Sequence, residues 1–139
     1  MVASRVNKAV GMTETQVVST DGAPAAIGPY SQAIVANGFV FTAGQIPLDP
    51  MTKLVVPGGI AEQTERVMQN LEAILAASGS SFERVVKTTC FLANLDDFAA
   101  FNEAYSTRFG ANPPARSTVQ AAKLPLSVLV EVECVALIP

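Results

Sequence analysis

The alternation of apolar and polar residues divides the first half of the chain into short strands. Asn37-Gly38 separates two β-like runs at 31–36 and 39–43. This dipeptide favours a two-residue hairpin turn, because both residues accept positive φ. A short strand is expected at 17–19. The β-branched run at 85–92, VVKTTCFL, is typical of a largely buried central strand.

Two later segments carry the repeat of an amphipathic helix. At 60–75, apolar positions recur every 3.6 residues on one face, and the helix is expected to end at Gly79. Asn94 is suited to cap a second helix, whose aromatic stripe would pack onto a sheet: Phe98, Phe101, Tyr105 and Phe109. With strands at 116–121 and 128–137, the predicted order is β-β-β-α-β-α-β-β, and two helices can cover only one sheet face.

The final predicted strand has two apolar faces. One face is uniformly apolar and belongs under the helices, whereas the other also carries Glu131 and Glu133. Their spacing on a strand places the two carboxylates about 7 Å apart. A buried charge without a partner is costly, so a cationic or hydrogen-bonding group should meet them. If the chain forms a terminal hairpin that turns near 123–124, Arg116 falls roughly opposite Glu131.

The chemistry of Arg116 and Glu131 leaves two interpretations open. The two residues could form a structural ion pair at an interface between subunits. Alternatively, Arg116 could bind a small carboxylate, because the planar guanidinium fork accommodates a carboxylate in a bidentate manner. In that case a nearby glutamate could orient water or exchange a proton. Residue types and spacing do not decide between these interpretations.

Composition narrows the class of protein further. The chain has 139 residues, which suits a single domain, and its 50% apolar and 15% charged residues suggest that other copies of the chain cover part of its surface. Nine basic and twelve acidic residues, with no basic run, argue against nucleic-acid binding. The sequence contains no histidine, which removes the usual general base and the commonest zinc ligand. Cys90 and Cys134 match no metal-binding spacing and are expected to be buried free thiols.

Residues 1–15 are expected to form a flexible N-terminal arm, and residues 16–139 a single domain. The first dozen residues are basic but lack the apolar core of a secretory signal; a native arm, a transit-peptide remnant and a cloning scar all fit this composition. The longest uncharged stretch, 27–48, contains too many proline, glycine and amide residues for a membrane helix. We therefore expect a soluble intracellular protein, in the cytoplasm or in a plastid or mitochondrial matrix.

Six stretches of sequence occur in the same order as in a known family: AAIGPYSQA (25–33), FTAGQIP (41–47), VVKTTCFL (85–92), DDFAAFNEAY (96–105), PPARSTV (113–119) and VEVECVA (130–136). From Val17 to the C-terminus the chain resembles the RidA proteins, the reactive intermediate deaminases also called YjgF-like. The resemblance implies a chorismate-mutase-like α+β fold, with a mixed β-sheet and two helices on one face. It also implies a homotrimer around a central β-barrel, with active sites in the clefts between subunits.

The resemblance further implies an activity. RidA proteins hydrolyse reactive 2-imino acids and their enamine tautomers, such as 2-iminobutanoate and 2-iminopropanoate, to 2-oxo acids and ammonia. These imines are released by pyridoxal-phosphate enzymes such as threonine dehydratase, in the pathway of isoleucine biosynthesis, and can damage other such enzymes. The family needs no metal and no organic cofactor. The implied partners are therefore a small 2-imino or 2-oxo acid and further copies of the chain, without nucleic acid or membrane.

Individual residues match the family's site. Arg116 matches the arginine that holds the substrate carboxylate, and Glu131 matches the glutamate that positions the attacking water and helps to transfer protons. Tyr30 and Asn102 match residues that surround the ligand. Gly44 matches a glycine whose backbone lies against the ligand, where a side chain would hold the ligand away.

Two residues depart from the family pattern. Thr118 replaces a cysteine found in many RidA proteins, so a reactive thiol cannot be essential here; its hydroxyl could instead bind the substrate or a water. Ala43 replaces a serine found in some bacterial relatives, which leaves one side-chain donor fewer near the ligand. The preferred imino acid therefore stays open.

Two other classes of function also stay open. One is a trimer that binds small 2-oxo or imino acids without turnover. The other is an endoribonuclease or translation inhibitor, an activity attributed to several relatives. The acidic pI of about 4.8 and the absence of basic runs argue against this last class.

Overall fold

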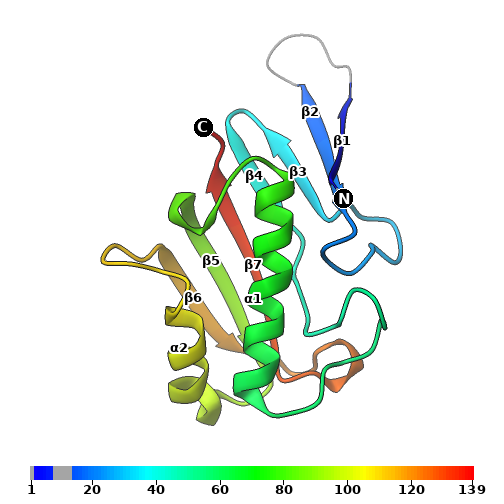
Figure 1. Ribbon diagram of the computed structural model, residues 1–139. Coiled ribbons are helices and arrows are strands. Elements are labelled where there is room, and N and C mark those ends of the chain that lie inside the picture. Colours follow the sequence, from blue (N-terminus) through cyan, green and yellow to red (C-terminus); the bar gives the residue numbers. More distant parts are fainter. Residues whose placement is uncertain (1, 8–13) are drawn as a thin grey trace.

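A single sheet organises the part of the chain that the computed structural model describes, residues 2–7 and 14–139 (Figure 1). The sheet has seven strands in the order β1-β2-β3-β4-β7-β5-β6. These strands are β1 (Val2–Asn7), β2 (Thr15–Thr20), β3 (Ala33–Ala36), β4 (Phe39–Thr42), β5 (Val85–Leu92), β6 (Ala115–Gln120) and β7 (Val130–Leu137). Two helices, α1 (Ile60–Ala77) and α2 (Phe98–Ser106), lie on one face of the sheet.

Most of the predicted elements are confirmed. Strands β3 and β4 form the expected antiparallel hairpin, in which Asn37 and Gly38 take φ values of 51° and 81°. Helix α1 ends just before Gly79, which has a φ of 82° and closes the helix as predicted. Strand β5 coincides with the predicted run at 85–92.

Helix α2 begins differently from the prediction. The side chain of Asn94 does act as a cap, but it accepts the backbone N–H of Asp96 at the start of a single 3-10 turn, Leu95–Asp97, which precedes the helix. Of the aromatic stripe, Phe101 and Tyr105 are buried against the sheet as expected, whereas Phe98 is 39% exposed. Further short 3-10 turns occur at Phe82–Arg84 and Pro125–Ser127.

The N-terminal segment contains a strand that the sequence pattern did not predict. Strand β1 pairs antiparallel with β2 at the edge of the sheet. Backbone hydrogen bonding, rather than an apolar pattern, defines such an edge strand, which explains why the sequence did not predict it. Met1 and residues 8–13, which belong to the predicted arm, lie outside the described residues.

The predicted terminal hairpin is wrong, because β6 and β7 are not neighbours. Strand β5 lies between them, parallel to β6 and antiparallel to β7. Helix α2 carries the chain back along the sheet between β5 and β6, as parallel strands require. Arg116 consequently lies beside Thr88 of β5 instead of opposite Glu131.

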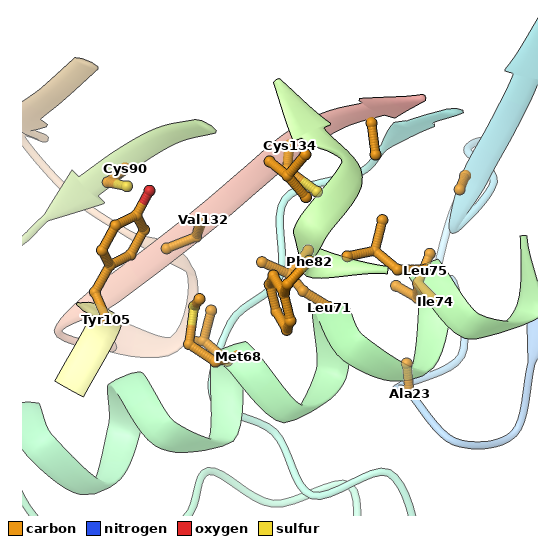
Figure 2. Close-up of a cluster of buried hydrophobic side chains, with 14 of the residues drawn as sticks. Ala23, Met68, Leu71, Ile74, Leu75, Phe82, Cys90, Tyr105, Val132 and Cys134 are labelled. Carbon is orange, nitrogen blue, oxygen red and sulfur yellow. The ribbon is translucent and has the colours of Figure 1, made fainter. Parts of the chain in front are cut away.

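The core lies between the helices and the covered face of the sheet. Figure 2 shows apolar side chains of α1 pointing toward β7: Met68, Leu71, Ile74 and Leu75 from the helix, with Val132 and Cys134 from the strand. The alternate residues of β7 behave as predicted, because Val130, Val132, Cys134 and Ala136 are all buried. Cys90 and Cys134 are buried and free, which confirms that expectation.

The opposite face of the sheet is not covered by any element of the described chain (Figure 1). Exposed apolar side chains from three strands lie there, including Phe41 of β4, Val119 of β6 and Leu137 of β7. Neither helix in the described residues has the length and apolar character needed to cross a bilayer.

Candidate functional site

Arg116 is held at the edge of the sheet by aromatic rings. It stands on the outermost strand β6, on the face that the helices cover, and its guanidinium lies against α2. The guanidinium carbon Cζ is 4.9 Å from the ring centre of Tyr105, 5.3 Å from that of Phe98 and 5.8 Å from that of Phe101. These distances are within the range of cation–π attraction. We call the three rings the aromatic cradle.

Among the described side chains, Arg116 has an amide partner and no acidic partner. Its Nη1 donates a hydrogen bond of 2.8 Å to Oδ1 of Asn102, one turn of α2 before the end of the helix. Among the side chains that the structure describes, those of residues 14–139, an ion pair is instead formed between Arg108 and Glu65, 2.9 Å apart. A guanidinium has five N–H donors, so Arg116 retains donors and a full positive charge for an anion.

Beneath the cradle lies a pair of buried hydroxyl groups. The Tyr105 hydroxyl and Thr88 Oγ1 are 2.7 Å apart, and the thiol of Cys90 contacts Thr88 Oγ1 at 3.9 Å. Figure 2 shows the Tyr105 hydroxyl directed toward Cys90. Burial raises the pKa of Tyr105 above its usual value and that of Cys90 to about 11, so both groups stay protonated near neutral pH.

Thr118 lies two residues beyond Arg116 on the same face of β6, as predicted. Its hydroxyl oxygen is buried and interacts with the thiol of Cys90, but makes no hydrogen bond of normal geometry within the described part of the chain. The register places Thr118 beside Cys90. An unsatisfied buried hydroxyl is unfavourable, which makes Thr118 suited to bind a water or a ligand.

A hollow of about 370 Å³ opens beside the guanidinium. It is lined by Arg116, by Asn102, Tyr105 and Ser106 of α2, and by the turn residues Phe109, Gly110, Pro113 and Pro114. The lining combines one cation and a few polar groups with apolar rings. Such a hollow suits a small acid that has an apolar side chain.

Glu131 and Gly44 form a second group on the uncovered face of the sheet. Gly44 follows β4, and the next residue, Gln45, pairs with Val132 through backbone hydrogen bonds of 2.8 and 3.1 Å. A Cβ atom on Gly44 would overlap a carboxylate oxygen of Glu131 and would lie 2.9 Å from its Cδ. Glycine is therefore needed there to make room for the glutamate.

Two effects raise the pKa of Glu131. Partial burial is the larger cause, and the negative charge of Glu133 on the same face of β7 is the second. A carboxylate with a raised pKa gives and takes protons more readily near neutral pH. The raised pKa makes Glu131 a candidate for proton transfer.

Tyr30 belongs to a surface loop and is 52% exposed. The loop turns at Gly28, which has a φ of 117°, and the Tyr30 hydroxyl accepts a 3.3 Å hydrogen bond from the backbone N–H of Ile27. The structure thus places Tyr30 in neither of the two groups described above.

A single chain does not bring Arg116 and Glu131 together, which corrects the prediction that they lie opposite each other. Arg116 is paired with Thr88, and Thr88 with Cys134, so all three point to the covered face. Glu131 lies three residues from Cys134 and points to the other face. The aromatic stripe predicts only a packing role for Tyr105. Its position three residues after Asn102, on the same side of the helix, could have linked it to Arg116.

Solved structures define the class to which this α+β architecture belongs. A Thermotoga maritima protein described as a candidate endoribonuclease has 51% sequence identity and a TM-score of 0.86, over 88% of this chain and 97% of that chain. Escherichia coli TdcF, solved with bound serine, has 39% identity and a TM-score of 0.83, over 88% of this chain and 98% of that chain. The likeness extends to nearly the whole domain.

The chain belongs to the YjgF/RidA family. Residues 20–138 match the family described as Endoribonuclease L-PSP. A protein of Arabidopsis thaliana named Reactive Intermediate Deaminase A, chloroplastic, is 52% identical over 87% of this chain and 65% of that protein. The 2-iminobutanoate/2-iminopropanoate deaminase of Rattus norvegicus is 46% identical over 87% of this chain and 88% of that protein. Family membership is thus confirmed, and the names of the relatives include both deaminases and endoribonucleases.

Proposed function

We propose that the protein hydrolyses reactive 2-imino acids and their enamine tautomers, including 2-iminobutanoate and 2-iminopropanoate, to 2-oxo acids and ammonia. The observation that carries this proposal is the guanidinium of Arg116, which has no acidic partner in the described chain and borders a hollow sized for a small acid. The deaminase names of the plant and rat relatives support it. So does the serine bound to TdcF, because serine carries the same kind of carboxylate.

The proposed active site lies between two copies of the chain in a homotrimer. Arg116 and Glu131 point to opposite faces of one sheet, so one substrate can meet both only if they come from different copies. One copy supplies Arg116, Asn102 and Thr118, and its neighbour supplies Glu131, Gly44 and Tyr30. The exposed apolar residues of the uncovered face support this assembly, because a second copy would remove them from water, as in a barrel at the centre of a trimer.

In the proposed mechanism Arg116 binds the substrate carboxylate while Asn102 holds one of its nitrogen atoms in place. The substrate reacts as its protonated imine: Glu131 accepts a proton from a water molecule while the water oxygen adds to the imine carbon, which gives a neutral carbinolamine. Glu131 then returns this proton to the nitrogen, the C–N bond breaks to release ammonia, and the carbinolamine hydroxyl forms the C=O bond of the 2-oxo acid and gives its proton back to Glu131. Such general acid–base help contributes about 10²- to 10⁴-fold to a rate. An imine is already electrophilic, so the absence of histidine from the sequence is compatible with this chemistry.

A trapping assay tests the proposal. An amino-acid dehydratase or oxidase generates the imine, semicarbazide traps it, and the protein is expected to suppress trapping by hydrolysing the imine first. Arg116→Ala should lose this effect, whereas Arg108→Ala, which removes an arginine already paired with Glu65, should retain it. If the Arg116 variant stays as active as the unmodified protein, the proposed carboxylate site is wrong.

The same assay addresses the alternatives. A trimer that only binds 2-oxo or imino acids would retain the ligand without suppressing semicarbazide trapping. The family's description keeps endoribonuclease activity as a second candidate. Its test is RNA cleavage that persists through purification and disappears in a site variant. With twelve acidic and nine basic residues the chain has a net charge of −3, which disfavours binding to the phosphates of RNA. RNA is therefore the weaker candidate for the substrate.

The proposed substrate also suggests a place in metabolism. Reactive imines arise from pyridoxal-phosphate enzymes such as threonine dehydratase, so we expect the protein to protect this class of enzyme and the isoleucine pathway. We expect it wherever such enzymes work, in the cytoplasm or in a plastid or mitochondrial matrix. The chloroplastic relative in Arabidopsis supports an organelle as one possibility.

A further inference from the structure

We propose that Tyr105 and Thr88 are positioning residues for the substrate-binding arginine. Their buried hydroxyl pair fixes the aromatic cradle beneath Arg116, and thereby sets the affinity of the site for a carboxylate. This inference rests on the proposed function, because it assigns Arg116 as the carboxylate ligand. Neither hydroxyl is given a part in the chemical step.

The geometry ties the helix to the strand directly below the guanidinium. Thr88 is the register partner of Arg116 on the neighbouring strand, so its side chain lies next to that of Arg116 on the covered face. Its hydroxyl meets that of Tyr105 at 2.7 Å, and the Tyr105 ring is the nearest of the three rings to the guanidinium, at 4.9 Å. The contact between the two hydroxyls therefore fixes the position of the Tyr105 ring relative to the guanidinium of Arg116.

Packing alone does not account for this pair. Tyr105 is 5% exposed and Thr88 is 1% exposed, so both hydroxyls are removed from water, where phenylalanine and valine would fill the same space without a polar atom. Each hydroxyl is satisfied mainly by the other, together with the weak thiol contact from Cys90. The raised pKa of Tyr105 supports the argument, because the phenol stays neutral and the contact persists across the physiological range.

The aromatic cradle also holds the guanidinium of Arg116 in place, a role that an acidic side chain usually has. A carboxylate partner would hold the guanidinium but would compete with the substrate for its charge. Aromatic faces attract the cation without neutralising it and leave N–H groups free in the plane of the guanidinium. Phe98 supports this interpretation, because it is 39% exposed although it belongs to the stripe predicted to pack on the sheet.

A double-mutant cycle tests the hydroxyl pair. Thr88→Val and Tyr105→Phe each leave one buried hydroxyl unpaired, and the combined variant removes both. We expect each single variant to raise KM about five- to tenfold with kcat nearly unchanged, and the double variant to raise KM to a similar extent, because all three lose the same contact. Thermal stability should fall in the single variants and recover in the double variant, where no buried hydroxyl is left unpaired. Ser78→Ala, which removes another part-buried hydroxyl bond of 2.7 Å at the C-terminal cap of α1, is the matched control and should leave KM unchanged.

Chemical rescue tests the cradle separately from the stability of the fold. In Arg116→Ala, free guanidinium ion should restore part of the activity by occupying the vacated place over the rings. Adding Tyr105→Leu removes the nearest ring, and we expect the guanidinium concentration for half-maximal rescue to rise about tenfold. A purely structural role would lower the thermal midpoint but leave this concentration unchanged.

Binding of 2-oxobutanoate, a non-reacting carboxylate, separates the two proposals. Calorimetry should show weaker binding in Thr88→Val, in Tyr105→Phe and, to a similar extent, in the double variant. If these affinities do not change, the positioning role is wrong, even if deamination proceeds. If the affinities change as expected but no imine is hydrolysed, the positioning role stands and the proposed function fails.

Discussion

The covered and uncovered sides of the sheet carry opposite charges that are stabilised in different ways. On the covered side, Arg116 is surrounded by three aromatic rings and one amide oxygen. On the uncovered side, Glu131 is half-buried above Gly44, with the like charge of Glu133 nearby. Among the described side chains, Arg116 has several stabilising neighbours but no anionic partner, whereas Glu131 has a like charge nearby and no cationic partner.

This difference explains why a site that looks incomplete in one chain can be complete in an assembly. Within one chain, the sheet itself separates Arg116 from Glu131. Each group meets a complement only if a second copy brings its uncovered side to the edge strand β6. The proposed active site therefore requires an interface between two copies of the chain, one with Arg116 and the other with Glu131.

Mixing two inactive variants provides the largest expected effect. Arg116→Ala and Glu131→Gln should each lower kcat/KM by at least about 10²-fold, because each removes a charge-assisted contact with the reacting complex. Co-expressed in equal amounts, they should assemble at random, so that one site in three of each mixed trimer, and about one site in four of the whole population, combines an intact Arg116 with an intact Glu131. Activity should then recover to about a quarter of that of the unmodified protein.

The trapping assay on separately purified and on co-expressed variants measures this recovery. The control is a double variant that carries both changes in one chain. Its trimers should stay inactive, because no site then contains an intact Arg116 or an intact Glu131. If the co-expressed single variants also stay inactive while mixed trimers are present, the two groups do not act at one shared site.

Gly44→Ala tests the uncovered side alone. The added methyl group would displace the Glu131 carboxylate, since the new Cβ would lie 2.9 Å from Cδ. We expect kcat to fall by about 10- to 100-fold and the binding of 2-oxobutanoate to change much less, because the arginine lies on another surface. Steady-state kinetics and calorimetry measure the two effects. An equal loss in both would contradict the separation of roles. Gly38→Ala would be a poor control, because Gly38 has a positive φ of 81°.

The pH dependence should follow Glu131. Burial and Glu133 raise its folded-state pKa above the usual 4.5, and the mechanism needs the ionised form. Activity should therefore decline as the pH falls through this raised pKa. Glu133→Gln removes a like charge, so it should move this acid limb to lower pH by less than about one unit, because exposed charges are screened. A pH–rate profile of both proteins checks the shift, and a shift to higher pH would contradict the assignment.

Arg108→Ala should have the smallest effect. Arg108 donates two hydrogen bonds of 2.9 Å to Glu65 and so has its own counter-ion, in contrast to Arg116. Loss of this partly exposed pair should lower the free energy of unfolding by about 1 kcal/mol or less and leave KM unchanged. Chemical denaturation and the trapping assay measure both quantities. A large rise in KM would contradict this prediction, because it would show that Arg108 contributes to substrate binding despite its pairing with Glu65.

Local sequence predicted most of the fold. The Asn37-Gly38 turn, the ends of α1 and the limits of β5 all follow from residues close together in the chain. The pairing of β6 was predicted wrongly, because an apolar strand pattern is the same for a hairpin and for a parallel crossover. Strand β1 was not predicted for a similar reason, since its pairing with β2 is a matter of backbone hydrogen bonds.

The candidate site divides in the same way. The family motifs name Arg116, Glu131, Gly44, Asn102, Thr118 and Tyr30 as residues to consider, and the chemistry of an arginine and a glutamate suggests a carboxylate and a proton transfer. The sequence by itself also determined which face of β7 is apolar, because strand residues alternate between faces.

Only the tertiary structure decided where these residues stand relative to one another. It placed Arg116 on the helix side, at the edge of the sheet, and Glu131 on the uncovered side, and it brought Tyr105 and Thr88 beneath the guanidinium. The physical reason is that strand order and helix packing depend on contacts between segments far apart in the chain. Residue spacing along the sequence does not record those contacts.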